Sequence, residues 1–129
     1  MGVQHLVTQG INSWRDLKVW QAAHALVLDV YVVTQSFPSR ERFRLTDQLC
    51  RASASIPTNI AEGKGRLSTR DYIHFLTIAR GSVEEVKYLL LLSRDLGYLA
   101  EESYLKLSDR YDEVGRMLNG LIRALKDRA

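Results

Sequence analysis

Apolar side chains recur along most of the chain at intervals of three and four residues, as in the series Leu45, Leu49, Ala52, Ile56 and Ile60. This spacing places apolar side chains on one face of an α-helix, whereas a half-buried strand would need them at alternate positions. The helical spacing continues throughout the chain. The sequence therefore predicts an all-α fold.

Turn-forming sequences divide this pattern into four helices. The first helix is expected to begin near Ser13 or Asp16, either of which can cap free amides, and to end near Ser36. The sequence FPSRER then interrupts the helical pattern, and Ser39 is a plausible N-cap for the second helix.

The third and fourth helices have clearer patterns. Ser68 and Asp71 can form a capping box at the start of the third helix, and Gly97 is a natural residue to end it. No good capping residue precedes the fourth helix at Ala100, but its apolar positions alternate steps of four and three, as in helical bundles. The two apolar stripes are Tyr72, Leu76, Ala79, Val83, Val86 and Leu90, and Leu107, Tyr111, Val114, Leu118, Leu121 and Leu125.

Short connections make successive helices antiparallel neighbours, so the sequence predicts an antiparallel up-down-up-down four-helix bundle. We expect one domain over residues 16–129, preceded by a loosely ordered segment of residues 1–15. With 129 residues, of which 46% are hydrophobic and 26% charged, the chain has the composition of a folded globular protein.

The first helix differs from the others because it is apolar on two sides. One stripe consists of Val19, Ala23, Leu26, Val30 and Val33, and the second consists of Leu17, Trp20, Val27 and Tyr31. In a small bundle one side of a helix meets the core, which leaves the other side for a partner. We therefore predict that the second stripe is a subunit interface with another copy of the chain.

The sequence Gly63-Lys64-Gly65-Arg66 looks like part of a phosphate-binding loop. A Walker-type loop lies between a strand and a helix, has a four-residue spacer before its Gly-Lys pair, and has Ser or Thr after the Lys. Here the sequence follows a helix and lacks both the spacer and the hydroxyl residue. We expect instead that Gly63 or Gly65 ends the second helix in the left-handed conformation.

Pro57 is expected to kink the second helix, because proline removes one amide and its ring presses on the carbonyl of Ser53. Asn59 follows close to the inner face, and Glu84 or Glu85 of the third helix is a candidate to meet it. We predict a satisfied polar cluster that fixes the register of the two helices. The alternative is that both glutamates are simply solvated.

Groups that could carry catalysis or bind a metal are sparse. Di-metal bundles use Glu-x-x-His pairs, and no glutamate here has a histidine three residues later. His5, His24 and His74 do not pair at ligand spacing, and Cys50 is expected to be a buried, inert thiol. The sequence predicts no catalytic residue, no metal and no cofactor.

The expected location is the cytoplasm, without membrane contact. The single cysteine cannot form an internal disulfide and fits a reducing compartment. The N-terminal sequence does not have the pattern of a signal peptide, and the most apolar stretch, residues 19–33, is too short and too often interrupted to span a bilayer.

Positive charge is better organised than any catalytic group. The chain has 18 Lys and Arg against 15 Asp and Glu, a net charge of +3 that permits a polyanionic partner without requiring one. The candidate nucleic-acid-binding residues lie along the first half of the second helix and around its far end: Arg40, Arg42, Arg44, Arg51, Lys64, Arg66 and Arg70.

We expect no aromatic interleaving in this basic set that would read single-stranded bases, so any contact with RNA or DNA is expected to use the phosphate backbone. The alternative is a solvated face balanced by Glu41, Asp47 and Glu113. A symmetric ring would favour binding, because it multiplies a modest patch on one surface.

Three segments resemble the 23S rRNA intervening sequence protein family: DLKVWQAAHALVLDVY, FPSRERFRLTDQLCRASASIPTNIAEGKGR and DYIHFLTIARGSVEEVKYLLLLSRDLGYL. The most specific piece is SIP-x-NIAEG at residues 55–63, supported by ARGS-x-E at residues 79–84. The matching motif positions, which we interpret as structural, are Pro57, Asn59, Glu62, Gly63, Arg80 and Gly81.

This resemblance implies a small cytoplasmic four-helix bundle that assembles as a five-membered ring. Some members of the family are encoded within insertions in large-subunit ribosomal RNA genes. A related group serves as the accessory subunit of diversity-generating retroelements, where a basic ring pairs with a reverse transcriptase and nucleic acid. The family has no established catalytic residues, so none is transferred to this chain.

The sequence thus predicts a non-enzymatic homo-oligomer, expected to be a pentamer, that binds structured RNA or another nucleic acid through pooled basic residues. The alternative is a protein-interaction scaffold or accessory subunit that recruits a partner enzyme without binding nucleic acid. Dependence on salt separates the two functions, because counterion release makes nucleic-acid affinity fall steeply as salt is added.

Overall fold

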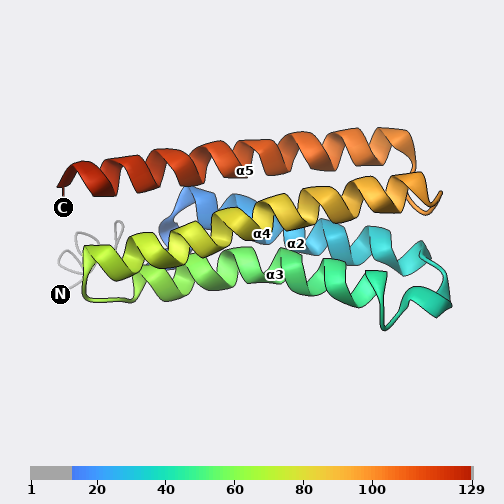
Figure 1. The fold of residues 1–129 in the computed structure, drawn as a ribbon, viewed down its shortest axis with the longest axis horizontal. Coiled ribbons are helices and arrows are strands. Elements are labelled where there is room, and N and C mark those ends of the chain that lie inside the picture. Colours follow the sequence, from blue (N-terminus) through green and yellow to red (C-terminus); the bar gives the residue numbers. More distant parts are fainter. Residues whose placement is uncertain (1–12, 129) are drawn as a thin grey trace, which may run out of the picture.

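The computed structural model describes residues 13–128, which form four long α-helices and three short 3₁₀ turns (Figure 1). The long helices are α2 (Lys18–Val33), α3 (Leu45–Lys64), α4 (Thr69–Asp95) and α5 (Glu101–Arg128). The 3₁₀ turns are η1 (Trp14–Asp16), η2 (Thr34–Ser36) and η3 (Ser39–Glu41). No strand occurs in residues 13–128, which confirms the all-α prediction.

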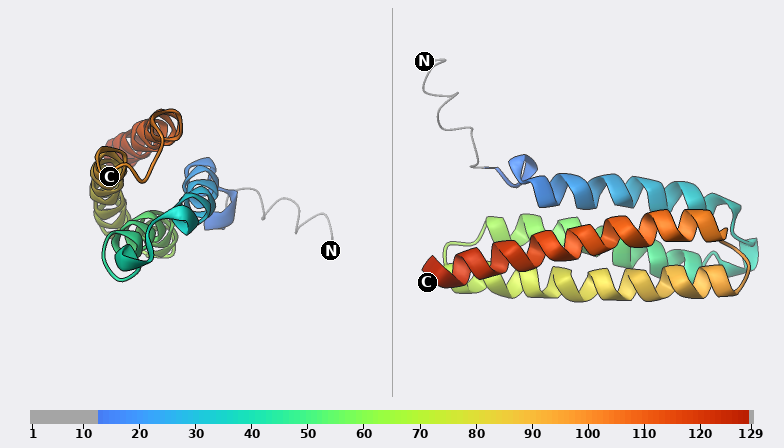
Figure 2. Two further views of the ribbon diagram at one scale, coloured as in Figure 1. Left: turned by 90° about the vertical axis from the view of Figure 1, so that its right-hand side faces the viewer. Right: turned by 90° about the horizontal axis from the view of Figure 1, so that it is seen from above.

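The four helices lie side by side along most of their length. In Figure 1, α2 and α4 run from left to right, whereas α3 and α5 run from right to left. The end-on view in Figure 2 shows them around an arc in the order of the chain. Each long helix packs against the next one, and α2 also contacts α5, so that the apolar faces share one core.

The core contains the residues that the helical spacing predicts. All five apolar positions predicted for α3, from Leu45 to Ile60, are buried, and so are the α2 positions Val19, Ala23, Leu26 and Val30. In α5 the predicted positions are buried except Leu121, which is partly buried, and Ile122 is buried in its place. The reason is the helical period of 3.6 residues, which makes strict alternation of four and three steps drift off the core face.

Two of the predicted helix ends are confirmed. The side chain of Ser68 accepts a hydrogen bond from the amide of Asp71 at 3.0 Å, and Gly97 follows α4 with φ +84°. At the other end of the chain, Ser13 caps η1 rather than α2, accepting from the amide of Arg15 at 3.1 Å. These residues fall within the segment predicted to be loosely ordered; the rest of that segment, residues 1–12, lies outside the described residues.

The prediction that Gly63 or Gly65 ends α3 in the left-handed conformation is wrong. Gly65 is the C-cap with φ −81°, and Gly97 alone has a positive φ among the described residues. Gly63 lies inside the helix and is buried. A Cβ atom built on Gly63 would lie 2.9 Å from the Cβ of Phe75 and 3.0 Å from the Tyr72 ring. Glycine is therefore required there because α3 and α4 approach closely.

The start of α3 also differs from the prediction. Ser39 begins η3, and α3 starts only after Arg44, which has no capping side chain. The Glu41 carboxylate accepts the Tyr98 hydroxyl at 2.9 Å and the amide of Leu45 at 3.4 Å. Because Tyr98 belongs to the distant α4–α5 connection, this tertiary contact holds the segment before α3 in turns. Arg40, Arg42 and Arg44 thus precede the helix instead of lying along it.

Helix length and hydropathy do not indicate a membrane span. Within residues 13–128, no helix combines the length and the apolar character needed to cross a bilayer.

Candidate nucleic-acid and subunit interfaces

Six of the seven predicted basic residues form two groups at opposite ends of α3. The first group, which we call the basic tip, is Arg40, Arg42 and Arg44, and the second, which we call the turn patch, is Lys64, Arg66 and Arg70. Between them α3 extends for 20 residues, which at 1.5 Å per residue is about 30 Å. The pooled basic set is therefore not one patch on a single copy.

The basic tip carries its charge without neutralising partners. No carboxylate among residues 13–128 lies within 4.0 Å of the guanidinium groups of Arg40, Arg42 or Arg44. Arg40 packs over the Tyr98 ring at 6.0 Å and donates to its hydroxyl at 3.4 Å. The tip is thus positioned by Tyr98, and its arginines remain free to bind phosphate.

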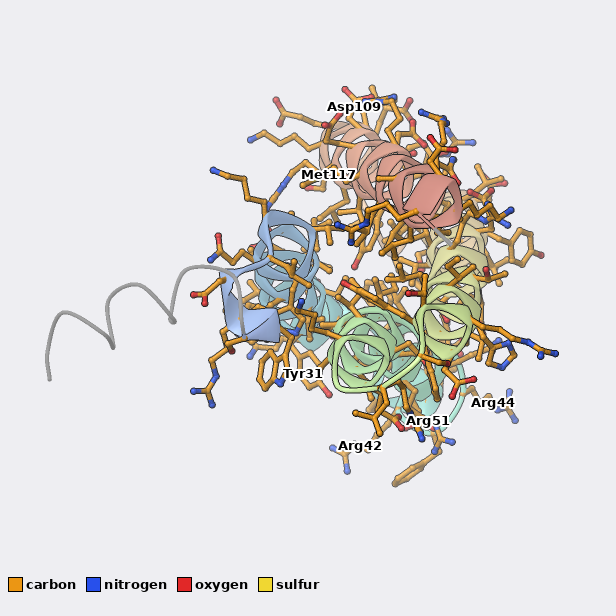
Figure 3. The ribbon with its side chains drawn as sticks, turned by 90° about the vertical axis from the view of Figure 1, so that its left-hand side faces the viewer. Tyr31, Arg42, Arg44, Arg51, Asp109 and Met117 are labelled. Carbon is orange, nitrogen blue, oxygen red and sulfur yellow. The ribbon has the colours of Figure 1, made fainter. Side chains whose placement is uncertain are left out.

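Arg51 lies in the N-terminal half of α3, the half that follows the basic tip. Figure 3 shows Arg42, Arg44 and Arg51 pointing outward on the same side of the bundle, with Asp109 of α5 on the opposite side. The Arg51 side chain is 79% exposed and its distance to Asp47 is 4.0 Å, the outer limit for an ion pair. Such an exposed pair contributes little stability, so Arg51 can change partner at low cost.

The turn patch is built differently, because its cations lie over aromatic rings of α4. Lys64 lies 6.0 Å from the Tyr72 ring, and Arg66 lies 4.6 Å from the Phe75 ring and 3.3 Å from Glu62. Aromatic rings thus lie beside these cations, but both rings are partly buried, so the prediction that no aromatic residue among the basic set reads single-stranded bases stays a prediction. The aromatic residues are distant in sequence and come together only when α3 packs on α4.

Phe43 is a residue that the sequence reasoning missed. It lies in the basic tip, between Arg42 and Arg44, and its side chain is 83% exposed. The Arg42 guanidinium lies 5.9 Å from the ring centre. The alternation Arg-Phe-Arg was visible in the sequence, but the prediction of a helix from Ser39 onward hid the exposure of the ring.

The second stripe of α2 borders an apolar groove between α2 and α3. Leu17, Trp20 and Val27 are partly buried, and Tyr31 is 51% exposed. The groove has a volume of about 440 Å³, and its α3 wall includes Pro57. Figure 3 shows Tyr31 on the outer surface beside α3. This exposed apolar strip is where the sequence predicted a subunit interface.

An aromatic stack holds one rim of this groove. Trp20 lies between Trp14, with ring centres 4.8 Å apart, and His24, with ring centres 4.9 Å apart and nearly parallel planes. Aromatic pairs at such distances attract each other by about 0.5–1.5 kcal/mol beyond the area they bury, which stabilises this rim.

The polar cluster predicted around Asn59 forms with other partners. The Asn59 side-chain amide donates to the backbone oxygen of Ser55 at 2.8 Å and to its Oγ at 3.1 Å, and Ser55 Oγ lies 2.9 Å from Ser82 Oγ. Glu84 is exposed and lies 3.8 Å from Lys87, so its pairing with Asn59 is a wrong prediction. Ser82 is the residue of α4 that meets Ser55, whereas Glu84 and Glu85 are exposed, as in the alternative that both glutamates are solvated.

The sequence profile of the 23S rRNA-intervening sequence proteins matches residues 15–120. The chain belongs to this family. A crystal structure of an S23 ribosomal protein family member of unknown function from Bacteroides thetaiotaomicron has the same fold, with a TM-score of 0.75 and 24% sequence identity. The match covers 81% of this chain and 95% of that one. No functionally curated protein matches the sequence.

The motif positions shared with the 23S rRNA-intervening sequence proteins lie mostly at helix contacts. Pro57 and Gly63 are buried in α3, and Arg80 of α4 donates to the Asn119 side chain of α5 at 3.0 Å. Gly81 and Glu62 are the exceptions: a Cβ atom on Gly81 would meet nothing within 4 Å, and Glu62 is exposed beside Arg66. The packing of a single copy therefore explains these positions except Glu62 and Gly81.

The histidines and the cysteine of this family member are dispersed. Among residues 13–128, no group of three His, Cys, Asp or Glu side chains could hold a metal ion. His24 and His74 are exposed, and His5 lies outside the described residues. Cys50 is partly buried, with its Sγ 3.7 Å from Thr34 Oγ1.

Proposed function

We propose that antiparallel up-down-up-down bundles of this chain assemble into a cytoplasmic homopentamer that binds structured RNA or another nucleic acid and catalyses no reaction. The observation that supports binding is the basic tip, whose three arginines lie together without carboxylate partners among the described residues. Arginine is suited to this role because its planar guanidinium donates two hydrogen bonds to phosphate oxygens.

Assembly would increase the attraction between these basic residues and a polyanion. A ring with cyclic symmetry brings one basic tip from each copy to the same height, and one turn patch from each copy to another height. The ring would then present two belts of positive charge, which attract a polyanion far more strongly than one copy does. The choice of five subunits rests on the family resemblance.

The nucleic-acid proposal predicts a salt-dependent defect. Replacing Arg40, Arg42 and Arg44 with alanine should weaken RNA binding and reduce the slope of log affinity against log salt by about 2 to 3, because each lost phosphate contact removes about 0.7 to 0.9. Fluorescence anisotropy with a labelled RNA hairpin, between low and moderate salt, measures both effects.

The matched control replaces three charges elsewhere. The triple alanine variant of Arg110, Arg116 and Arg123 in α5 removes the same charge from other positions of the bundle. It should keep most of the slope. Equal defects in the two triple variants would mean that net charge alone controls binding, and an unchanged slope in both would contradict the proposal.

The subunit interface leads to a separate prediction. Replacing Tyr31 with aspartate should convert the oligomer to smaller species, because a charge would be buried in the contact beside the groove. Leu105→Asp in α5 is the control, since Leu105 is 53% exposed and Tyr31 is 51% exposed. Light scattering coupled to a sizing column gives the mass; an unchanged mass for Tyr31→Asp would place the interface elsewhere.

A protein-interaction scaffold is the second candidate, favoured by the apolar groove between α2 and α3. A partner protein bound there would contact Trp20 and Val27, and the binding would change little with salt. The same column run, with absorbance read at protein and nucleic-acid wavelengths, separates the two functions. Nucleic acid that leaves the protein in high salt supports the first candidate.

A further inference from the structure

Phe43 is the most exposed aromatic side chain among the described residues, at 83%, against 59% for Tyr88 and 51% for Tyr31. A single exposed apolar side chain is common on protein surfaces and by itself requires no explanation. The surroundings of Phe43 are what make it informative, because it lies within the three arginines of the basic tip.

The positive charge around Phe43 exceeds the charge of the acid in the same segment, because three arginines and one glutamate leave residues 39–44 with a net charge of +2. Glu41 is the one acidic residue among residues 39–44, and its carboxylate is engaged by the Tyr98 hydroxyl at 2.9 Å and by the amide of Leu45 at 3.4 Å. These two hydrogen bonds tie the segment to Tyr98 and to the start of α3. Arg42 and Arg44 flank an aromatic face that remains open to solvent.

This arrangement fits an unpaired base better than a protein side chain. A protein hot spot is an apolar anchor at the centre of an interface depleted of charge, whereas Phe43 has a rim of cations. Proteins that bind single-stranded nucleic acid combine cationic groups along the backbone with aromatic rings on which bases stack. Bases inside a duplex are already stacked, so their faces are not accessible to Phe43.

We propose that Phe43 stacks on an unpaired base of the bound nucleic acid, while Arg42 and Arg44 contact the phosphates on either side. The inference rests on the proposed nucleic-acid function and narrows its ligand to single strands and loops. The rings beside the turn patch are less accessible than Phe43, because Tyr72 and Phe75 are partly buried and Lys64 and Arg66 lie over them.

Fluorescence anisotropy of the full chain with two labelled probes tests this inference. The probes are a 20-nucleotide uridine RNA and a blunt 20-base-pair RNA duplex, each titrated at several salt concentrations. The change Phe43→Ala should weaken binding of the single strand roughly tenfold or more. It should leave the salt slope and the duplex affinity nearly unchanged, because no phosphate contact is lost.

Two variants separate stacking from charge and shape. Phe43→Trp should restore single-strand binding, and the new indole should be quenched when the uridine RNA binds, beyond any quenching seen in the wild type. The pair Arg42→Ala and Arg44→Ala should instead lower the single-strand salt slope by about 1.4, or 0.7 for each phosphate contact. Leu105→Ala, which removes an exposed apolar side chain of α5 away from both basic groups, should bind as the wild type does.

The outcomes distinguish this inference from the function on which it rests. If Phe43→Ala binds both probes like the wild type, or loses the same factor for both, the stacking inference is wrong. The proposed function still stands in that case, provided that the Arg40, Arg42 and Arg44 triple variant loses its salt slope. If the wild type binds neither probe at low salt, the proposed function fails, and the inference fails with it.

Discussion

Replacing Gly63 with alanine should lower the free energy of unfolding by about 1–3 kcal/mol, although alanine is the better helix former. The added Cβ atom would lie 2.9 Å from the Cβ of Phe75 and 3.2 Å from the backbone oxygen of Tyr72. Neither atom is at the end of a flexible side chain, so α3 and α4 would have to separate locally. Chemical denaturation followed by circular dichroism measures the loss.

The control for this prediction is the same change at Gly120 in α5, where a Cβ atom would meet nothing within 4 Å. Gly120→Ala should raise the free energy of unfolding by about 0.5–1 kcal/mol, because alanine loses less backbone entropy in a helix. The two substitutions therefore have opposite expected signs. A Gly63→Ala protein as stable as Gly120→Ala would mean that α3 and α4 do not approach as closely at this point as the structure shows.

Gly63 also illustrates what the sequence could and could not predict. The apolar spacing predicted the helices and nearly all of the core, because burial on one face of a helix is a local, periodic property. The same spacing carries no information about the distance between two helices. A glycine near a helix end is therefore taken for a helix-ending residue, when the helix in fact continues and packs closely on its neighbour.

The basic tip was misplaced for a related reason. The position of Ser39 within FPSRER, directly after Pro38, suggested a capped helix, and the contact that prevents one involves Tyr98, which is 57 residues from Glu41 in the sequence. The same holds for Asn59, whose neighbours on α4 depend on the helix register. Residue types thus identified the arginines as candidates, but only the packing showed that Arg40, Arg42 and Arg44 precede the helix and that Phe43 among them is exposed.

Tyr111 leads to the second prediction, a loss of stability in alkali. Its side chain is fully buried in the core, and its hydroxyl has no hydrogen-bond partner among the described residues. Burial raises the pKa of Tyr111 well above its ordinary value of 10.0, and nearby Asp29 raises it further, although Arg110 lowers it. In the folded protein the phenol therefore stays neutral at a pH where the unfolded chain ionises.

The sign of the effect follows from this raised pKa. The contribution of neutral Tyr111 to stability is fully present below pH 10 and is lost as the pH rises toward the folded-state pKa. Between pH 10 and pH 12 the free energy of unfolding should fall by about 2 kcal/mol through this one group, since each pH unit costs up to about 1.4 kcal/mol. Urea denaturation repeated across this range measures the fall.

Tyr111→Phe should remove this part of the alkaline loss and should not weaken the fold at neutral pH, because the missing hydroxyl has no protein partner to leave unsatisfied. Tyr88→Phe is the matched control: Tyr88 is 59% exposed, so its hydroxyl meets solvent in both states, and the variant should follow the wild type at every pH. Some alkaline loss should remain in Tyr111→Phe, since partial burial also raises the pKa of Tyr72. If Tyr111→Phe and the wild type lose stability in parallel above pH 10, the Tyr111 hydroxyl reaches solvent in the folded state, and the α2–α5 side of the core is more open than the structure shows.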